Sequence, residues 1–192
     1  MAVHDETESE PVIVRKRGRR TAARTSLSRA LKGVRLFATD VDGVLTDGGM
    51  YYSESGDELK KFNTRDGMGI KLLQRAGLIT ALITMEETKL VMRRAEKLAI
   101  PEVHQGAREK LAVLRALAAR HGLTLEEMAY IGDDVNDLEA LKAVGFSAAP
   151  ADAMPSVLKV VNYVCRKSGG EGAVREVVDL ILAAQASGPV KR

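Results

Sequence analysis

Residues 37–48 read FATDVDGVLTDG, an apolar run that ends in two carboxylates one residue apart and continues into a glycine-rich segment. The run over 34–39 has the length and composition of a strand buried on both faces of a parallel sheet. In open α/β folds, ligands bind beyond the carboxyl ends of such strands. The stretch therefore predicts an α/β sheet whose ligand-binding edge carries Asp40 and Asp42.

Two carboxylates held this close repel each other and shift each other's pKa unless a cation neutralises them. Hard oxygen ligands favour Mg²⁺, and one Asp is then available as a nucleophile and the other as an acid/base. A calcium loop of the EF-hand type would need Asp or Asn at Val44 and Gly at the next position, which the sequence lacks. Solvated acids at the end of a strand remain the alternative.

The composition narrows the class of protein. The net charge of +3 comes from an Arg- and Lys-rich segment over 15–35, so it does not indicate nucleic-acid binding by the whole chain. The single Cys165 excludes an internal disulfide and suits a reducing compartment, and the three histidines lack zinc-ligand spacing. No apolar stretch reaches membrane length. We therefore expect a cytoplasmic protein with no membrane partner.

The 192 residues fit one domain and a tail. We expect a disordered basic N-terminal tail over 1–30, a catalytic domain over 31–186 and a flexible C-terminus over 187–192. The tail is too polar to bury a core of its own, although 21–32 has the composition of a short helix leading into the first strand. Binding of an acidic partner by this tail is an alternative to a solvated segment.

Aromatic segments flank a Ser-Gly-Asp turn within 49–63, and this pattern predicts a β-hairpin rather than a crossover helix. Such a hairpin would stand above the predicted ligand site as a small flap. An isolated hairpin is marginally stable and its apolar residues need a partner surface. We therefore expect the chain to form an oligomer.

Beyond the hairpin, apolar runs alternate with helical periodicity. The predicted strands are 78–84, 100–104, 128–132, 146–149 and 160–164, and the predicted helices are 66–76, 86–99, 109–121, 138–144 and 173–184. Asp66 is a candidate N-cap for the first of these helices, and 167–172 reads as a mobile glycine loop. This alternation predicts a Rossmann-like α/β fold with a parallel sheet.

Polar residues recur where the predicted strands end or helices begin. They are Asp40, Asp42, Thr84, Lys110, Asp133, Asp134 and Asp137. Because the carboxyl ends of parallel strands share one edge, we expect these side chains to converge there. The set suits phosphoryl transfer, which depends on positioning and charge neutralisation. Mg²⁺ would be held by Asp40, the backbone carbonyl of Asp42, and Asp133.

In such a site Asp40 would attack phosphorus to form an aspartyl-phosphate. Asp42 would protonate the leaving alkoxide and then deprotonate the hydrolytic water. Thr84 and Lys110 would hold the phosphoryl oxygens, and Asp137 would orient Lys110. The sequence therefore predicts a Mg²⁺-dependent phosphomonoesterase.

The segment DVDGVLT (40–46), Thr84, Lys110 and the segment GDDVND (132–137) resemble, in order and as a set, the four motifs of the haloacid dehalogenase superfamily of phosphatases. The match extends over about 34–184. The roles given above are those that the superfamily implies for the matching positions. The resemblance also implies a three-layer α/β sandwich in which the β-hairpin flap takes the place of a cap domain.

A hairpin without a cap domain resembles the subclass that acts on 2-keto-3-deoxy sugar acid phosphates, namely 3-deoxy-manno-octulosonate 8-phosphate and the nononate or N-acylneuraminate 9-phosphates. FNTRDG (62–67) and GGEGAVRE (169–176) match that subclass. The resemblance implies surface-polysaccharide precursor synthesis and a homotetramer in which a neighbour's glycine-rich tail approaches the site. It also implies substrate contacts from Thr46, Arg65, Glu86, Lys97 and Gly170.

The choice between eight- and nine-carbon substrates stays open at this level. Glu86 and Lys97 are similar to the nononate group, Arg65-Asp66-Gly67 is similar to the octulosonate group, and Met85 departs from both. A broad sugar-phosphate phosphatase is a further alternative. Another is a non-catalytic scaffold whose basic tail binds nucleic acid or acidic lipid.

Overall fold

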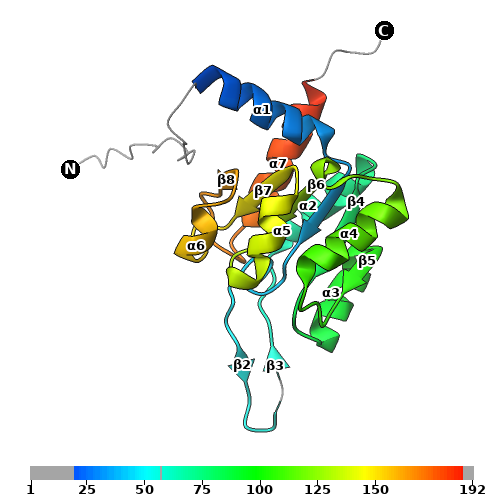
Figure 1. Cartoon of the computed structure of the whole chain (residues 1–192). Coiled ribbons are helices and arrows are strands. Elements are labelled where there is room, and N and C mark those ends of the chain that lie inside the picture. Colours follow the sequence, from blue (N-terminus) through cyan, green and yellow to red (C-terminus); the bar gives the residue numbers. More distant parts are fainter. Residues whose placement is uncertain (1–19, 57, 188–192) are drawn as a thin grey trace, which may run out of the picture.

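The computed structural model describes residues 20–56 and 58–187, with side chains described from residue 27 onward. Its centre is a six-stranded sheet in the order β5-β4-β1-β6-β7-β8, and every neighbouring pair is parallel (Figure 1). The strands are β1 (Leu36–Thr39), β4 (Ile79–Ile83), β5 (Glu102–His104), β6 (Met128–Ile131), β7 (Phe146–Ala149) and β8 (Tyr163–Val164). The predicted α/β fold with a parallel sheet is confirmed.

Helices cover both faces of the sheet and complete three layers. One apolar cluster joins the sheet to α1 (Arg20–Gly33), α2 (Thr64–Arg75), α3 (Lys89–Leu98) and α7 (Ala173–Ala186). The other joins it to α4 (Lys110–His121), α5 (Leu138–Ala143) and α6 (Pro155–Leu158). Short 3-10 turns lie at η1 (Leu125–Glu127) and η2 (Val135–Asp137). No helix in the described part of the chain is both long enough and apolar enough to cross a bilayer.

Strand β1 is the centre of the sheet because it is apolar on both faces. Phe37 packs into the cluster on the α2 and α7 side, whereas Leu36 and Ala38 pack into the cluster on the α4 side. All four residues of β1 are buried. The strand therefore delivers the segment that follows it, from Asp40 onward, to the middle of the carboxyl edge.

The predicted hairpin is present as β2 (Tyr51–Tyr52) paired antiparallel with β3 (Glu58–Leu59). It projects away from the body of the molecule at the carboxyl edge of the sheet (Figure 1). An isolated bridge between Thr46 and Phe62 closes its base. Tyr52 and Leu59 are 68% and 65% exposed, so the hairpin presents apolar surface that the described residues 20–56 and 58–187 do not cover.

The glycine loop before α7 packs closely, whereas the sequence predicts a mobile segment. The Gly170 N–H donates to the Val44 carbonyl over 3.0 Å, and both Gly169 and Gly170 are buried. A Cβ at Gly169 would overlap the carbonyl of Gly43. These glycines therefore serve close backbone approach between two loops rather than motion.

The expected boundary between tail and domain at residue 30 falls within α1, the helix that the sequence predicts over 21–32. Helix α1 contacts α7 and η1, and Leu31 belongs to the core. Residues 1–19 and 188–192 lie outside the described part of the chain. The disorder expected for the N-terminal tail and the flexibility expected for the C-terminus therefore stay predictions.

Asp66 is not the N-cap of α2, contrary to the sequence prediction. The helix begins earlier, at Thr64, and the Asn63 side chain caps it by accepting the N–H of Arg65. Asp66 is instead fully buried, and its Oδ1 accepts the N–H of Arg175 in the first turn of α7 over 2.8 Å. One carboxylate of α2 therefore caps α7.

We expect Asp66→Asn to be tolerated and Asp66→Ala to lower the free energy of unfolding by about 1–2 kcal/mol, because alanine leaves an α7 N–H without its acceptor. Asp66 Oδ2 is buried with no hydrogen-bond partner among the described residues, and burial raises the Asp66 pKa from 3.8 to about 6. The folded protein therefore holds this proton more tightly than the unfolded chain, and the stability due to Asp66 falls as pH rises from about 4 to 6.

Denaturant unfolding of wild type, Asp66→Asn and Asp66→Ala at pH 5 and pH 8 tests this prediction. Asparagine keeps an acceptor and does not titrate. The free energy of unfolding of Asp66→Asn, relative to that of wild type, should therefore be higher at pH 8 than at pH 5. Equal losses for asparagine and alanine at both pH values would contradict it.

Candidate active site

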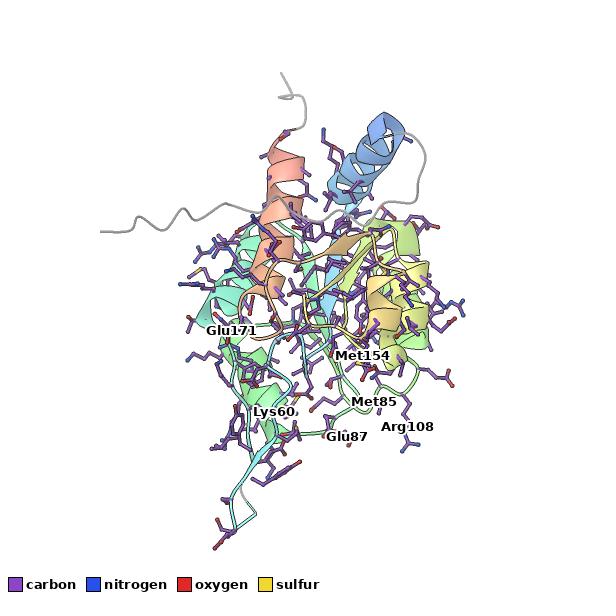
Figure 2. All side chains as sticks on the ribbon, turned by 90° about the vertical axis from the view of Figure 1, so that its left-hand side faces the viewer. Lys60, Met85, Glu87, Arg108, Met154 and Glu171 are labelled. Carbon is purple, nitrogen blue, oxygen red and sulfur yellow. The ribbon has the colours of Figure 1, made fainter. Side chains whose placement is uncertain are left out.

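Loops after β1, β4 and β6 enclose a pocket of about 260 Å³ at the carboxyl edge of the sheet. It is lined by Asp40, Asp42, Gly43, Gly48, Thr84, Met85, Glu86, Asp133, Asp134 and Asn136. Figure 2 places Lys60, Met85 and Met154 at the end of the molecule from which the hairpin projects. The predicted convergence of strand ends is therefore present.

A buried ion-paired group forms the floor of this site. Lys110, the first residue of α4, lies with its Nζ 2.5 Å from Asp40 Oδ2 and 2.6 Å from Asp137 Oδ1. The side chains of Lys110 and Asp137 are 0% exposed. The lysine therefore bridges the ends of β1 and η2 in the place that the sequence predicts.

Asp137 is held by more groups than the sequence predicts. The Tyr130 hydroxyl donates to its Oδ1 over 2.6 Å, and the N–H groups of Asp133 and Asp134 donate to its Oδ2. With Lys110 added, both carboxylate oxygens have at least two donors. Asp137 is thus an anchor that fixes Lys110 and the loop after β6. Sequence reasoning missed Tyr130, whose only signal is its place in a strand beside the acidic loop.

Three carboxylates at this edge could hold a cation. Oxygens of Asp40, Asp133 and Asp137 lie within 4.8 Å of one another. Because the Asp137 oxygens already accept four hydrogen bonds, Asp40 and Asp133 are the side chains with capacity for a metal. Gly43 allows the approach, since a Cβ there would overlap the Asp133 carboxylate.

The electrostatics of the site show an excess of negative charge. Burial and the neighbouring Asp137 raise the pKa of Asp40 to about 7 in spite of Lys110. Burial and Asp40 raise the pKa of Asp133 to about 8. Burial lowers the pKa of Lys110, but Asp40 and Asp137 outweigh it and the net shift is upward. One ammonium does not balance three carboxylates, and a divalent cation would.

Thr84 and Glu86 form the wall that follows β4. The Thr84 hydroxyl accepts the N–H of Glu86 over 3.2 Å, which fixes the turn after the strand. Glu86 lines the pocket, as does Met85, whose sulfur accepts the Asn136 amide over 3.4 Å. The structure therefore brings Thr84 and Glu86 to the pocket.

The other predicted substrate residues do not line this pocket. Thr46 is buried, and its hydroxyl accepts the N–H groups of Gly43 and Gly48, so it organises the loop from within. The Gly170 carbonyl accepts the Asn63 amide. Arg65 is exposed at the start of α2, and Lys97 is exposed in the last turn of α3, about 12 Å along the helix axis from its first residue. Substrate contacts from these four residues stay predictions.

Lys60 is the second residue that the sequence analysis missed. It follows β3 directly, and its Nζ lies 2.8 Å from both carboxylate oxygens of Asp42. Residues 58 and 60 share one face of the hairpin strand. The sequence therefore predicts that Glu58 and Lys60 lie on the same face of the strand. It does not predict that this face meets Asp42, because that depends on where the hairpin leaves the domain.

The model of the haloacid dehalogenase-like hydrolase family matches residues 80–177. The chain is 47% identical over 152 residues to the 3-deoxy-D-manno-octulosonate 8-phosphate phosphatase KdsC of Yersinia pestis, which covers 79% of this chain and 81% of that protein. Its identity to KdsC of Escherichia coli K12 is 44% over 154 residues, which covers 80% and 82%.

The fold is also similar to that of a solved structure. It is the 3-deoxy-D-manno-octulosonate 8-phosphate phosphatase of Moraxella catarrhalis, in complex with magnesium ion, phosphate ion and KDO. The TM-score is 0.83 at 41% identity, and the match covers 84% of this chain and 93% of that one.

Proposed function

The chain belongs to the haloacid dehalogenase-like hydrolases, and on that premise we propose that it is a Mg²⁺-dependent phosphomonoesterase that hydrolyses 3-deoxy-D-manno-octulosonate 8-phosphate. The observation that carries the proposal is the convergence of Asp40, Lys110 and Asp137 with Asp133 at one edge of the sheet. The relatives of known name and the complete set of four motifs support the same activity.

The donors at this edge fit Mg²⁺. Asp40 and Asp133 offer carboxylate oxygens, and Asp42, whose backbone carbonyl is the third proposed ligand, lines the same pocket two residues after Asp40. Hard oxygen ligands and an uncompensated negative charge are what this ion prefers. When bound, Mg²⁺ neutralises charge on the phosphoryl oxygens and on the surrounding carboxylates.

The side chains of the site carry out the remaining steps of the reaction. Asp40 attacks phosphorus through a carboxylate oxygen, and the bond from phosphorus to the sugar oxygen breaks. Asp42 gives its proton to that leaving oxygen and later takes one from the water that attacks the aspartyl-phosphate. Lys110 and Thr84 stabilise the transferring phosphoryl group, while Asp137 keeps Lys110 in place.

The relatives favour the eight-carbon sugar acid, because those named are octulosonate 8-phosphate phosphatases. Glu86 is exposed and lines the pocket, so among the predicted substrate residues it is the one placed to contact the sugar. Preference for a nine-carbon acid would make Glu86 a specificity residue of the nononate type. Arg65 and Lys97 would reach the sugar only from outside the pocket described above.

The test is Mg²⁺-dependent phosphate release by the full chain. We expect the highest kcat/KM with 3-deoxy-manno-octulosonate 8-phosphate, lower values with the nononate and N-acetylneuraminate 9-phosphates, and loss of turnover on removal of Mg²⁺ with EDTA. A preference for a nine-carbon substrate would overturn the substrate assignment. Absence of release from every sugar phosphate would overturn the enzyme assignment.

We further propose that the chain forms a homotetramer, in the cytoplasm, through its hairpins. Tyr51, Tyr52 and Leu59 are at least half exposed on a two-stranded element that protrudes from the domain. Such surface is typical of an interface between copies. Light scattering after gel filtration should give four times the chain mass, and Tyr52→Glu should lower it. A monomeric wild type would refute the assembly.

A further inference from the structure

Lys60 makes an unusually complete contact with Asp42. Its ammonium lies 2.8 Å from Oδ1 and 2.8 Å from Oδ2, and its side chain is 0% exposed while that of Asp42 is 26% exposed. A lysine is rarely removed from water completely unless it is paired. The contact therefore has to be explained by what it does for Asp42.

The two-oxygen contact fixes the rotation of the Asp42 carboxylate. The Thr46 hydroxyl also contacts this carboxylate, but it is 3.4 Å from Oδ1, which is long for an O–H···O bond. Proton transfer requires the acid and the leaving oxygen to lie within hydrogen-bond reach. Without Lys60, a partly exposed carboxylate would be free to turn toward solvent.

Glu58 gives Lys60 a second partner on the same strand. Its Oε1 lies 3.6 Å from Lys60 Nζ and is buried with no hydrogen-bond partner among the described residues. The ammonium thus lies between one carboxylate of the hairpin and one of the loop after β1. This second partner helps to fix the ammonium beside Asp42.

The contact also links the flap to the chemistry. Other links at the base of the hairpin join Lys61 to Glu171 and Asp47, Asn63 to Gly170, and Asn63 and Phe62 to Arg94 of α3. Lys60 is the hairpin side chain for which the described residues show a contact with a proposed catalytic carboxylate. The position of the hairpin and the position of Asp42 are therefore coupled.

We propose that Lys60 is a positioning residue that holds the Asp42 carboxylate in place for proton transfer and makes the placement of the hairpin part of the catalytic geometry. This inference rests on the proposed function, in which Asp42 protonates the leaving oxygen. It predicts that replacing Lys60 lowers kcat/KM most for substrates whose leaving group must be protonated. Sugar alkoxides need one, whereas p-nitrophenolate leaves without one.

The experiment compares kcat/KM for 3-deoxy-manno-octulosonate 8-phosphate and for p-nitrophenyl phosphate in wild type and Lys60→Met. We expect a loss of about 100-fold on the sugar phosphate, chiefly in kcat, and a loss of less than about fivefold on p-nitrophenyl phosphate. Lys60→Arg should recover about tenfold of the sugar activity because it restores the charge and the donors. The matched control Lys142→Met removes an exposed lysine that pairs with Glu139 away from the hairpin, and it should resemble wild type.

Two further measurements distinguish loss of Asp42 positioning from general damage to the fold or to the metal site. The Mg²⁺ Kd of Lys60→Met from calorimetry should equal that of wild type, and its unfolding midpoint should fall only slightly, because the carboxylates left without Lys60 are 26% and 27% exposed. If Lys60→Met does not fold, Lys60→Gln provides the same comparison. Equal losses on both substrates, or a rise in KM at constant kcat, would overturn the proposal. Absence of phosphate release by wild type would instead overturn the proposed function.

Discussion

Replacing Asp40 with asparagine is expected to lower kcat by about 10⁴-fold or more while the protein stays folded. The amide cannot form the phosphoryl bond that Asp40 is proposed to form. The substitution should not destabilise the fold, because burial and Asp137 already raise the pKa of Asp40 to about 7 and make its charge unfavourable there. Lys110 keeps Asp137 as its partner.

Phosphate release and thermal unfolding of the same preparation, without Mg²⁺ for the unfolding, check both parts of the Asp40→Asn prediction. The matched control is Asp179→Asn, since Asp179 is exposed on α7 and pairs with Arg175 outside the site. It should keep wild-type turnover. Retained activity in Asp40→Asn would remove Asp40 from the role of nucleophile.

Replacing Lys110 with methionine is expected to damage both activity and stability, in contrast to Asp40→Asn. Methionine fills the volume but leaves Asp40 and Asp137 buried beside each other without a counter-charge. Removal of one partner from a buried charge cluster costs about 3–5 kcal/mol. We expect the unfolding midpoint in metal-free buffer to fall by roughly 10 °C, and kcat to fall by about 10³-fold.

A double substitution separates the two losses. Lys110→Met with Asp137→Asn removes one of the stranded charges, so it should recover stability but not turnover. Lys142→Met, which removes an exposed lysine paired with Glu139, is the matched control and should leave both unchanged. A Lys110→Met protein as stable as wild type would show that the ion-paired floor does not hold the fold together.

The architecture could be predicted from the sequence because its signals are strong and local. The apolar run before Asp40 is buried on both faces, as the pattern requires, and the aromatic segments around a turn form a hairpin. The limits of the elements were less predictable. Helix α3 begins at Lys89 because the Thr88 side chain accepts the N–H of Leu90, and the four-residue α6 is too short to show a period.

The site was predictable where residue type and strand position decide the outcome, as for Asp40, Thr84 and Lys110. It was not predictable where a contact depends on the path of a distant segment. Lys60 meets Asp42 only because the hairpin returns across the site, and Tyr130 meets Asp137 only because a turn of η2 brings the acid back over β6. The sequence therefore did not reveal the supporting roles of Lys60 and Tyr130, although it did indicate that of Asp137.

The close packing of the glycine loop has a consequence for how the chain acquires activity during synthesis. The loop that carries Asp42 is braced by the Gly170 N–H on the Val44 carbonyl, a contact between segments 126 residues apart in sequence. Nascent chains emerge from the ribosome N-terminus first. The nucleophile is therefore made early, but its loop gains this support only after almost the whole chain has left the ribosome. A partly translated chain would then carry the four motifs and still lack a finished catalyst.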